Sequence, residues 1–112
     1  MELQHRIAND IVIVSLSGKM MGGPDAAQLV DLLHDFLERG RKKFIVDLSG
    51  VDVMNSSGLG ILINALTTVK NQQGQLKLAS VTDKIKHLFT ITKLGQVFEI
   101  HETVDSATNS FV

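Results

Sequence analysis

Cysteine, tryptophan and tyrosine are all absent from this sequence of 112 residues. The lack of cysteine excludes disulfides and thiolate metal sites, and it fits a reducing compartment such as the cytoplasm. The lack of tryptophan and tyrosine removes the usual stacking platforms for single-stranded nucleic acid. A formal net charge of -1 also provides no field that would attract nucleic acid or anionic lipid. We therefore expect neither nucleic acid nor a membrane as a partner.

Long apolar runs are missing too, although 44% of the residues are hydrophobic. No run approaches the roughly 18 apolar residues of a membrane span. Residues 1–6 lack the basic-then-apolar layout of a secretion signal. A chain of this length is typical of one domain with a single core. We therefore expect one soluble domain over residues 1–112, located in the cytoplasm.

Short apolar runs alternate with segments of helical periodicity along the chain. The predicted strands are residues 3–8, 11–16, 44–48, 75–80 and 97–100. The predicted helices start at Pro24, at Ser56 and after the caps Thr82 and Thr103. The first three end near Gly40, Asn71 and Gly95, with Gly74 in the left-handed position after the second. In the last helix we expect Val104, Ala107 and Phe111 to face inward. Asn9-Asp10 favours a tight hairpin, whereas strands that alternate with helices favour right-handed crossovers. The prediction is an α/β fold with a mostly parallel sheet of about five strands, an antiparallel N-terminal hairpin strand and about four helices.

The most informative stretch is residues 51–60, which joins a predicted buried strand to a predicted amphipathic helix. Asn55 or Ser56 can cap the helix by accepting from its first free amides. Gly58 and Gly60 each cost roughly 1 kcal/mol of helix propensity, which indicates close approach of another surface. A phosphate added to a serine here would meet the positive end of the helix. From the residues alone, a cap with packing glycines is the favoured interpretation.

The stretch from Asp47-Leu48-Ser49 to Asn55-Ser56-Ser57-Gly58-Leu59-Gly60 resembles the core motif of the STAS domain. In particular it is similar to that of the bacterial anti-sigma factor antagonists, and the similarity extends over nearly the whole chain. The typical family motif is Asp-Ser-Ser-Gly-Leu-Gly, in which a partner kinase phosphorylates the second serine. The resemblance implies that Ser57 is this acceptor. Two departures remove carboxylates from its neighbourhood: Asn55 replaces the aspartate, and residues 19–21 replace an acidic turn.

The resemblance also implies a switchable binding protein. The unphosphorylated form would bind an anti-sigma factor, often a serine kinase, and so release sigma factor; phosphorylation of Ser57 would end that complex. Two other interpretations remain. In the first, the chain is an unphosphorylated STAS module in a larger signalling or lipid-transport complex. In the second, it is a domain that binds a small ligand or nucleotide.

A candidate partner-binding surface follows from the motif and from the turn before the first helix. Its predicted members are Met20, Met21, Asn55, Ser56, Ser57, Gly58, Ile61 and Ala65. We expect Ser56 to face inward, and Ile61 to be partly exposed because it lies outside the apolar stripe of Leu59, Leu62, Ile63, Leu66 and Val69. Core filling by the two methionines, and burial of Ile61 against a neighbouring helix, are the alternatives.

Signs of catalysis are missing from the sequence. The four histidines are scattered, and no pair has the spacing of a metal site. The serines lack a Gly-x-Ser-x-Gly elbow, and the glycines match neither a Walker loop nor a dinucleotide fingerprint. We therefore expect no enzyme activity, no metal and no cofactor.

Overall fold

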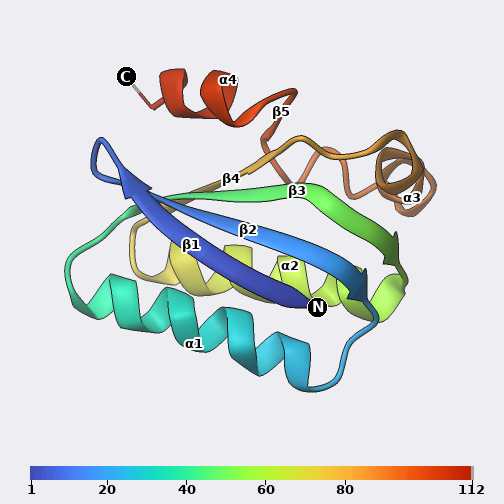
Figure 1. Cartoon of the computed structure of the whole chain (residues 1–112), viewed down its shortest axis with the longest axis horizontal. Helices are drawn as coiled ribbons and strands as arrows, with labels where there is room; N and C mark the ends of the chain where they lie inside the picture. Colours follow the sequence, from blue (N-terminus) through green and yellow to red (C-terminus); the bar gives the residue numbers. More distant parts are fainter. Residues whose placement is uncertain (112) are drawn as a thin grey trace.

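The computed structural model describes residues 1–111, which form one alternating α/β unit (Figure 1). The strands are β1 (Glu2–Ala8), β2 (Ile11–Met20), β3 (Lys43–Met54), β4 (Gln75–Ala79) and β5 (Ile100–His101). The helices are α1 (Pro24–Glu38), α2 (Ser56–Asn71), α3 (Asp83–Thr92) and α4 (Val104–Asn109). Within residues 1–111 the predicted fold class, with five strands and four helices, is confirmed.

The sheet has the order β1-β2-β3-β4-β5, with β1 antiparallel to β2 and the other neighbours parallel. Asn9 and Asp10 join β1 to β2 with φ angles of 51° and 70°. Two successive positive φ values are typical of the type I′ turn of a two-residue hairpin, and asparagine and aspartate tolerate them better than most residues. The predicted hairpin is therefore confirmed at these two residues.

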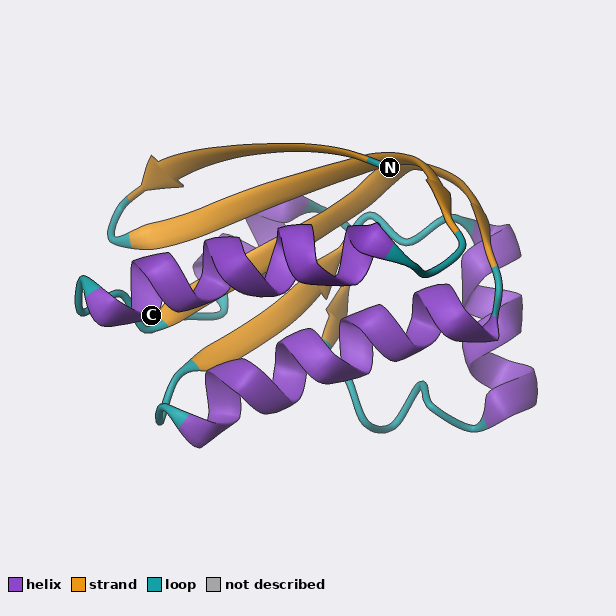
Figure 2. Cartoon of the chain, turned by 90° about the horizontal axis from the view of Figure 1, so that it is seen from below, coloured by secondary structure: helices purple, strands orange, loops and turns teal. Residues whose placement is uncertain are grey.

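Helices cover the two faces of the sheet unequally. Figure 2 shows α1 and α2 side by side across one face, and Figure 1 shows the short α4 on the other. The main core lies under α1 and α2 and includes Phe44, Val46 and Leu48, whereas Ile45 belongs to a smaller core that includes Ala107 of α4. Because β3 is buried on both faces at residues 44–46, these three residues form a continuous apolar run. Val104 and Phe111 pack on the smaller core, as predicted.

Both β2 and β3 are longer than predicted, since the expected ends were residues 16 and 48. Their parallel pairing continues to Met20↔Met54, across register shifts after Ser15 and Gly18. A Cβ on Gly50 would lie 2.8 Å from the Cβ of Ser17, so the glycine allows the two strands to stay together. Tertiary pairing thus overrides the polar, glycine-containing sequence that predicted loops. The last strand, β5, starts at residue 100 and not at 97.

The segments that follow α2 and α3 also differ from prediction. Gln73 (φ 59°), and not Gly74, takes this conformation after α2, and α3 ends at Thr92 with left-handed Lys93. Gly74 is needed for a different reason. A Cβ there would lie 2.8 Å from Cγ1 of Val69 and 2.9 Å from the carbonyl oxygen of Lys42. The glycine therefore allows close packing where the helix meets the sheet.

Candidate functional site

The serine motif lies where α2 begins, directly after β3. The adjacent ends of β2 and β3 are paired at Met20 and Met54, so the loop that leaves β2 passes the first turn of α2. This is the carboxyl end of the parallel strands, where binding sites in α/β folds gather. Residues 20–23 and 55–58 are thereby brought together from two parts of the sequence.

Asn55 is the N-cap of α2 and connects three segments of backbone. Its Oδ1 accepts a hydrogen bond from the amide of Gly58 at 2.8 Å, and its Nδ2 donates to the carbonyl oxygen of Met21 at 3.5 Å. Its backbone amide donates to the carbonyl oxygen of Met20 at 3.4 Å. The cap predicted for Asn55 or Ser56 is therefore Asn55. An aspartate would retain the first bond but has no hydrogen to donate to Met21.

The two glycines of the motif have different surroundings. A Cβ on Gly58 would lie 1.9 Å from the carbonyl oxygen of Met20, so only glycine allows α2 to approach β2 this closely. A Cβ on Gly60 would meet nothing within 4 Å, and this residue is exposed. The predicted close approach is thus confirmed for Gly58, where the other surface belongs to the same chain. No described neighbour accounts for Gly60.

Ser56 and Ser57 are both exposed, so the prediction that Ser56 faces inward is wrong. Asn55 already fills the cap position, which leaves Ser56 free to point outward. Among residues 1–111 neither serine hydroxyl has a hydrogen-bond partner. A Cβ on Gly22 would lie 2.9 Å from the Cβ of Ser57. Gly22 thus sets how closely the loop approaches Ser57; sequence reasoning missed this role, although the Gly22-Gly23 pair before Pro24 was a signal for it.

Four predicted members of the surface are buried. Met20 and Ala65 have 0% exposure and Ile61 has 3%, so the predicted partial exposure of Ile61 is wrong. Because α2 packs against both the sheet and α1, its buried arc is wider than one stripe, and Ile63 is only partly buried. The backbone of Gly58 is buried as well. The accessible remainder, which we name the Ser57 surface, consists of Met21, Asn55, Ser56 and Ser57, with Met21 48% exposed.

The Ser57 surface holds no charged side chain. The first turn of α2 contains no acidic residue, and its amides provide the partial positive charge of a helix N-terminus. Asp47 lies farther back on β3, seven residues before Met54, and accepts a hydrogen bond from the amide of Ser49 at 2.9 Å, which is a local turn contact. This arrangement can accept an anion but offers no base to activate a hydroxyl.

Neither a metal-binding cluster nor a membrane-spanning helix occurs in the part of the chain that the structure describes. Residues 1–111 contain no group of three histidine, aspartate or glutamate side chains that would hold a metal ion. No helix described between Pro24 and Asn109 combines the length and apolarity that crossing a membrane requires.

Comparison with known sequences gives consistent results. The model of the STAS domain matches residues 2–107. A Thermotoga maritima protein named as a candidate anti-sigma factor antagonist is 27% identical over 104 residues, which cover 92% of this chain and 91% of the relative. The anti-sigma-B factor antagonist of Listeria monocytogenes is 36% identical over 55 residues, covering 49% of this chain and 48% of the relative.

Comparison with solved structures supports the same relationship. The crystal structure of a candidate anti-sigma factor antagonist from Thermotoga maritima superposes with a TM-score of 0.84 at 25% identity, and the match covers 96% of this chain and 92% of that one. Anti-sigma factor antagonists of this kind are regulatory binding proteins and not enzymes. Because the family model spans nearly all of the sequence, this chain belongs to the STAS domain family.

Proposed function

We propose that this chain is an anti-sigma factor antagonist whose binding is switched off by phosphorylation of Ser57. The observation that carries the proposal is the position of the Ser57 hydroxyl, which is exposed and without a described partner at the start of α2. Relatives that are similar to most of this chain are named as anti-sigma factor antagonists. The Ser57 surface would contact the anti-sigma factor, which is a serine kinase in many systems of this type.

The chemistry of the switch follows from the uncharged residues that make up the Ser57 surface. A phosphate adds about −1.5 to −2 charges at pH 7. The first turn of α2 tolerates this anion because its free amides and dipole favour negative charge, so the free protein does not need to refold. Inside a complex, the same phosphate would be desolvated against a partner and would hold Met21 and Ser56 away from it. Modification therefore acts on binding much more than on folding.

Binding measurements with purified anti-sigma factors from the source organism test the proposal. Wild type and Ser57→Ala should bind one of them with similar affinity, whereas Ser57→Asp should bind at least tenfold more weakly. Thr67→Asp is the matched control, because it adds the same charge to an exposed position three turns along α2. Equal weakening by both aspartates would show a general charge effect and would contradict a switch at Ser57.

Phosphopeptide mapping tests the acceptor itself. After incubation with the partner kinase and ATP, the phosphate should lie on Ser57 and should be lost in Ser57→Ala but kept in Ser56→Ala. Since both serines are exposed, the geometry alone does not separate them, and the choice rests on the motif. A phosphate on Ser56 would overturn the assignment.

Asn55 favours a second candidate function, which is a STAS interaction module that is never phosphorylated. Its neutral amide gives both the helix cap and the bond to Met21, so the site is complete without a carboxylate. In that case the Ser57 surface would bind a partner constitutively. Stable binding without any phosphate incorporation, in the presence of each candidate kinase and ATP, would support this function over the first.

A further inference from the structure

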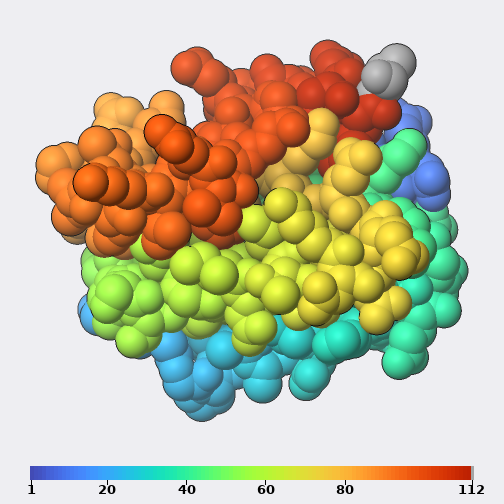
Figure 3. Space-filling model, turned by 180° about the vertical axis from the view of Figure 1, so that it is seen from behind, coloured from blue at the N-terminus to red at the C-terminus, as the bar shows by residue number. Residues whose placement is uncertain are grey.

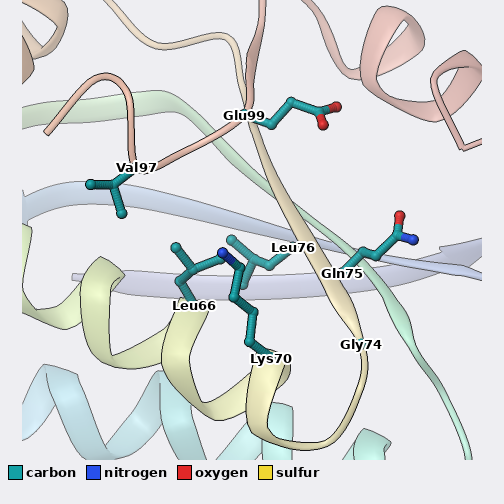
Figure 4. A pocket seen from close by; sticks show the side chains of 7 residues that line it. All are labelled: Leu66, Lys70, Gly74, Gln75, Leu76, Val97 and Glu99. Atoms are coloured by element: carbon teal, nitrogen blue, oxygen red, sulfur yellow. The ribbon is translucent and has the colours of Figure 1, made fainter.

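A concave site lies at the opposite end of α2 from Ser57. It is a groove of about 200 Å³ between the last turns of α2, the start of β4 and the segment before β5 (Figure 4). Its lining includes Leu66, Lys70, Gly74, Leu76, Val97 and Glu99, and we name it the Lys70 groove. At 1.5 Å per helical residue, Lys70 is about 20 Å from Ser57 along α2. Figure 3 shows residues 83–99, in orange, directly beside α2 on this face.

The floor and one wall of the Lys70 groove are apolar. Leu66 of α2 and Leu76 of β4 belong to the main core and form the floor. Val97 forms a wall and is 45% exposed, which is unusual for an apolar side chain in this protein. Apolar surface that remains open to water gains free energy when a ligand covers it.

One edge of the groove presents an unpaired backbone amide. The amide of Gln75 donates to the carbonyl oxygen of Lys42 near β3, so that of Leu76 points the other way, toward β5. Further along this edge, the amide of Leu78 donates to the carbonyl oxygen of Glu99 at 2.9 Å. The β5 pairing starts only at Leu78↔Ile100, and no acceptor for the Leu76 amide occurs among residues 1–111. A ligand in the groove that reaches this amide would supply its missing acceptor.

The charges around the groove favour an anion. Figure 4 shows the Lys70 ammonium directed into the space between Leu66 and Leu76, and no described carboxylate forms an ion pair with it. The carboxylate of Glu99 turns away from Lys70. It is held by Lys77 Nζ at 2.8 Å and by His101 Nε2 at 2.6 Å. One free cation and one free amide thus face an apolar floor.

We propose that the Lys70 groove binds a small organic carboxylate with an apolar body. The carboxylate would accept hydrogen bonds from Lys70 and from the amide of Leu76, and the body would cover Leu66 and Val97. A cavity of about 150 Å³ holds benzene, so the groove of about 200 Å³ suits a ligand of roughly eight non-hydrogen atoms. A free phosphate would leave the apolar floor uncovered. An added peptide strand would meet β5 only two residues beyond Leu76, so a small ligand fits better than a peptide.

Titration of the ¹⁵N-labelled protein with hexanoate, followed by amide NMR shifts, tests the proposal. The amides of Gly74, Leu76 and Val97 should shift together and saturate. Lys70→Gln should weaken the affinity at least fivefold, and Lys84→Gln, an exposed lysine on α3, should leave it unchanged. Both substitutions keep a long polar side chain at an exposed site, so the spectra should show the same fold.

The chemistry of the ligand is tested by two further probes. Hexanol has the apolar body without the charge, and it should bind at least fivefold more weakly than hexanoate. Inorganic phosphate that saturates the same amides as tightly as hexanoate would overturn the proposal, as would tighter binding by a peptide with a free C-terminal carboxylate. Equal affinity of wild type and Lys70→Gln, or shifts scattered over the surface, would also overturn it.

Discussion

The N-terminal end of α2 and the sheet face under α4 are held together by different kinds of contact. At the start of α2, the contacts are the neutral amide of Asn55 and the close approach of Gly58 to Met20. Under α4, the buried Lys77 ammonium pairs with Glu99, donates to Ser110 Oγ at 2.6 Å and lies 4.1 Å from the ring centre of Phe111. One region is built without charge and the other is organised by a charge.

This difference explains where the molecule tolerates a new charge. The positive charge of Lys77 is already balanced by the Glu99 carboxylate. Hydrogen bonds from Lys77, and then from His101, hold the pKa of that carboxyl below its usual value of 4.5. The Ser57 surface contains no charged residue, so an added phosphate would introduce the first charge on it. A neutral surface at a helix N-terminus is thus well suited to a switch, whereas the Lys77 cluster is suited to fixing α4.

The largest effect is expected for a charge placed inside α2. Ile61→Asp buries a carboxylate at a site with 3% exposure, so it should cost more than about 4 kcal/mol of folding free energy and leave the protein largely unfolded. Ser57→Asp adds the same group one turn earlier on the surface and should change the stability by less than about 0.5 kcal/mol. Thermal melts followed by circular dichroism compare the two variants. Similar melting temperatures would contradict the burial of Ile61.

The next effect separates the two glycines of the motif. Gly58→Ala places a Cβ against the carbonyl oxygen of Met20, so α2 and β2 must move apart at a cost of about 3 kcal/mol. Gly60→Ala meets no neighbour and should raise the stability by about 0.5 to 1 kcal/mol, because alanine favours the helix. Urea unfolding measures both free energies. A stabilised Gly60→Ala that also lost partner binding would show that a partner approaches Gly60 closely.

A smaller effect is expected at the cap of α2. Asn55→Ala removes the acceptor for the Gly58 amide and should cost about 1 kcal/mol in urea unfolding, whereas Asn55→Asp keeps that acceptor and should cost less than about 0.5 kcal/mol. Asn55→Asp also restores the carboxylate of the family motif beside Ser57. If that carboxylate orients the hydroxyl, the initial rate of phosphate incorporation should rise. An unchanged rate would show that Asn55 does not limit phosphorylation.

The smallest effect concerns the acid stability of the α4 face. Because the pKa of Glu99 is lowered by folding, its contribution to stability is present above the usual value of 4.5 and is lost as the pH falls through the lower, folded value. Lys77→Met removes the main cause of that shift. The melting temperature of Lys77→Met should therefore fall less than that of wild type between about pH 5 and pH 3. Lys70→Met is the control, because Lys70 forms no described ion pair, and it should keep the wild-type slope.

The sequence alone determined the local features of this protein. β-branched apolar runs indicated the strand cores, and Thr82 and Thr103 each cap a helix by accepting from the amide three residues later, as predicted. Pro24 starts α1, and Asn9-Asp10 forms the hairpin turn. These features depend on the conformational preferences of a few adjacent residues, so they are present in the sequence itself. The motif at residues 55–60 was sufficient to indicate the family.

Only the tertiary structure decided what depends on neighbours distant in sequence. Ile61 is buried and Ile63 is partly exposed because α1 and the sheet together cover a wide arc of α2. Position 58 must be glycine because the carbonyl oxygen of Met20, 38 positions earlier in the chain, lies where a Cβ would be. The Lys77 ammonium can be buried because Glu99 and Ser110, from later segments, bind it. Periodicity reports which side of one helix is apolar, but it does not report how many surfaces pack against it. Close approach and charge compensation arise only when separate segments fold together.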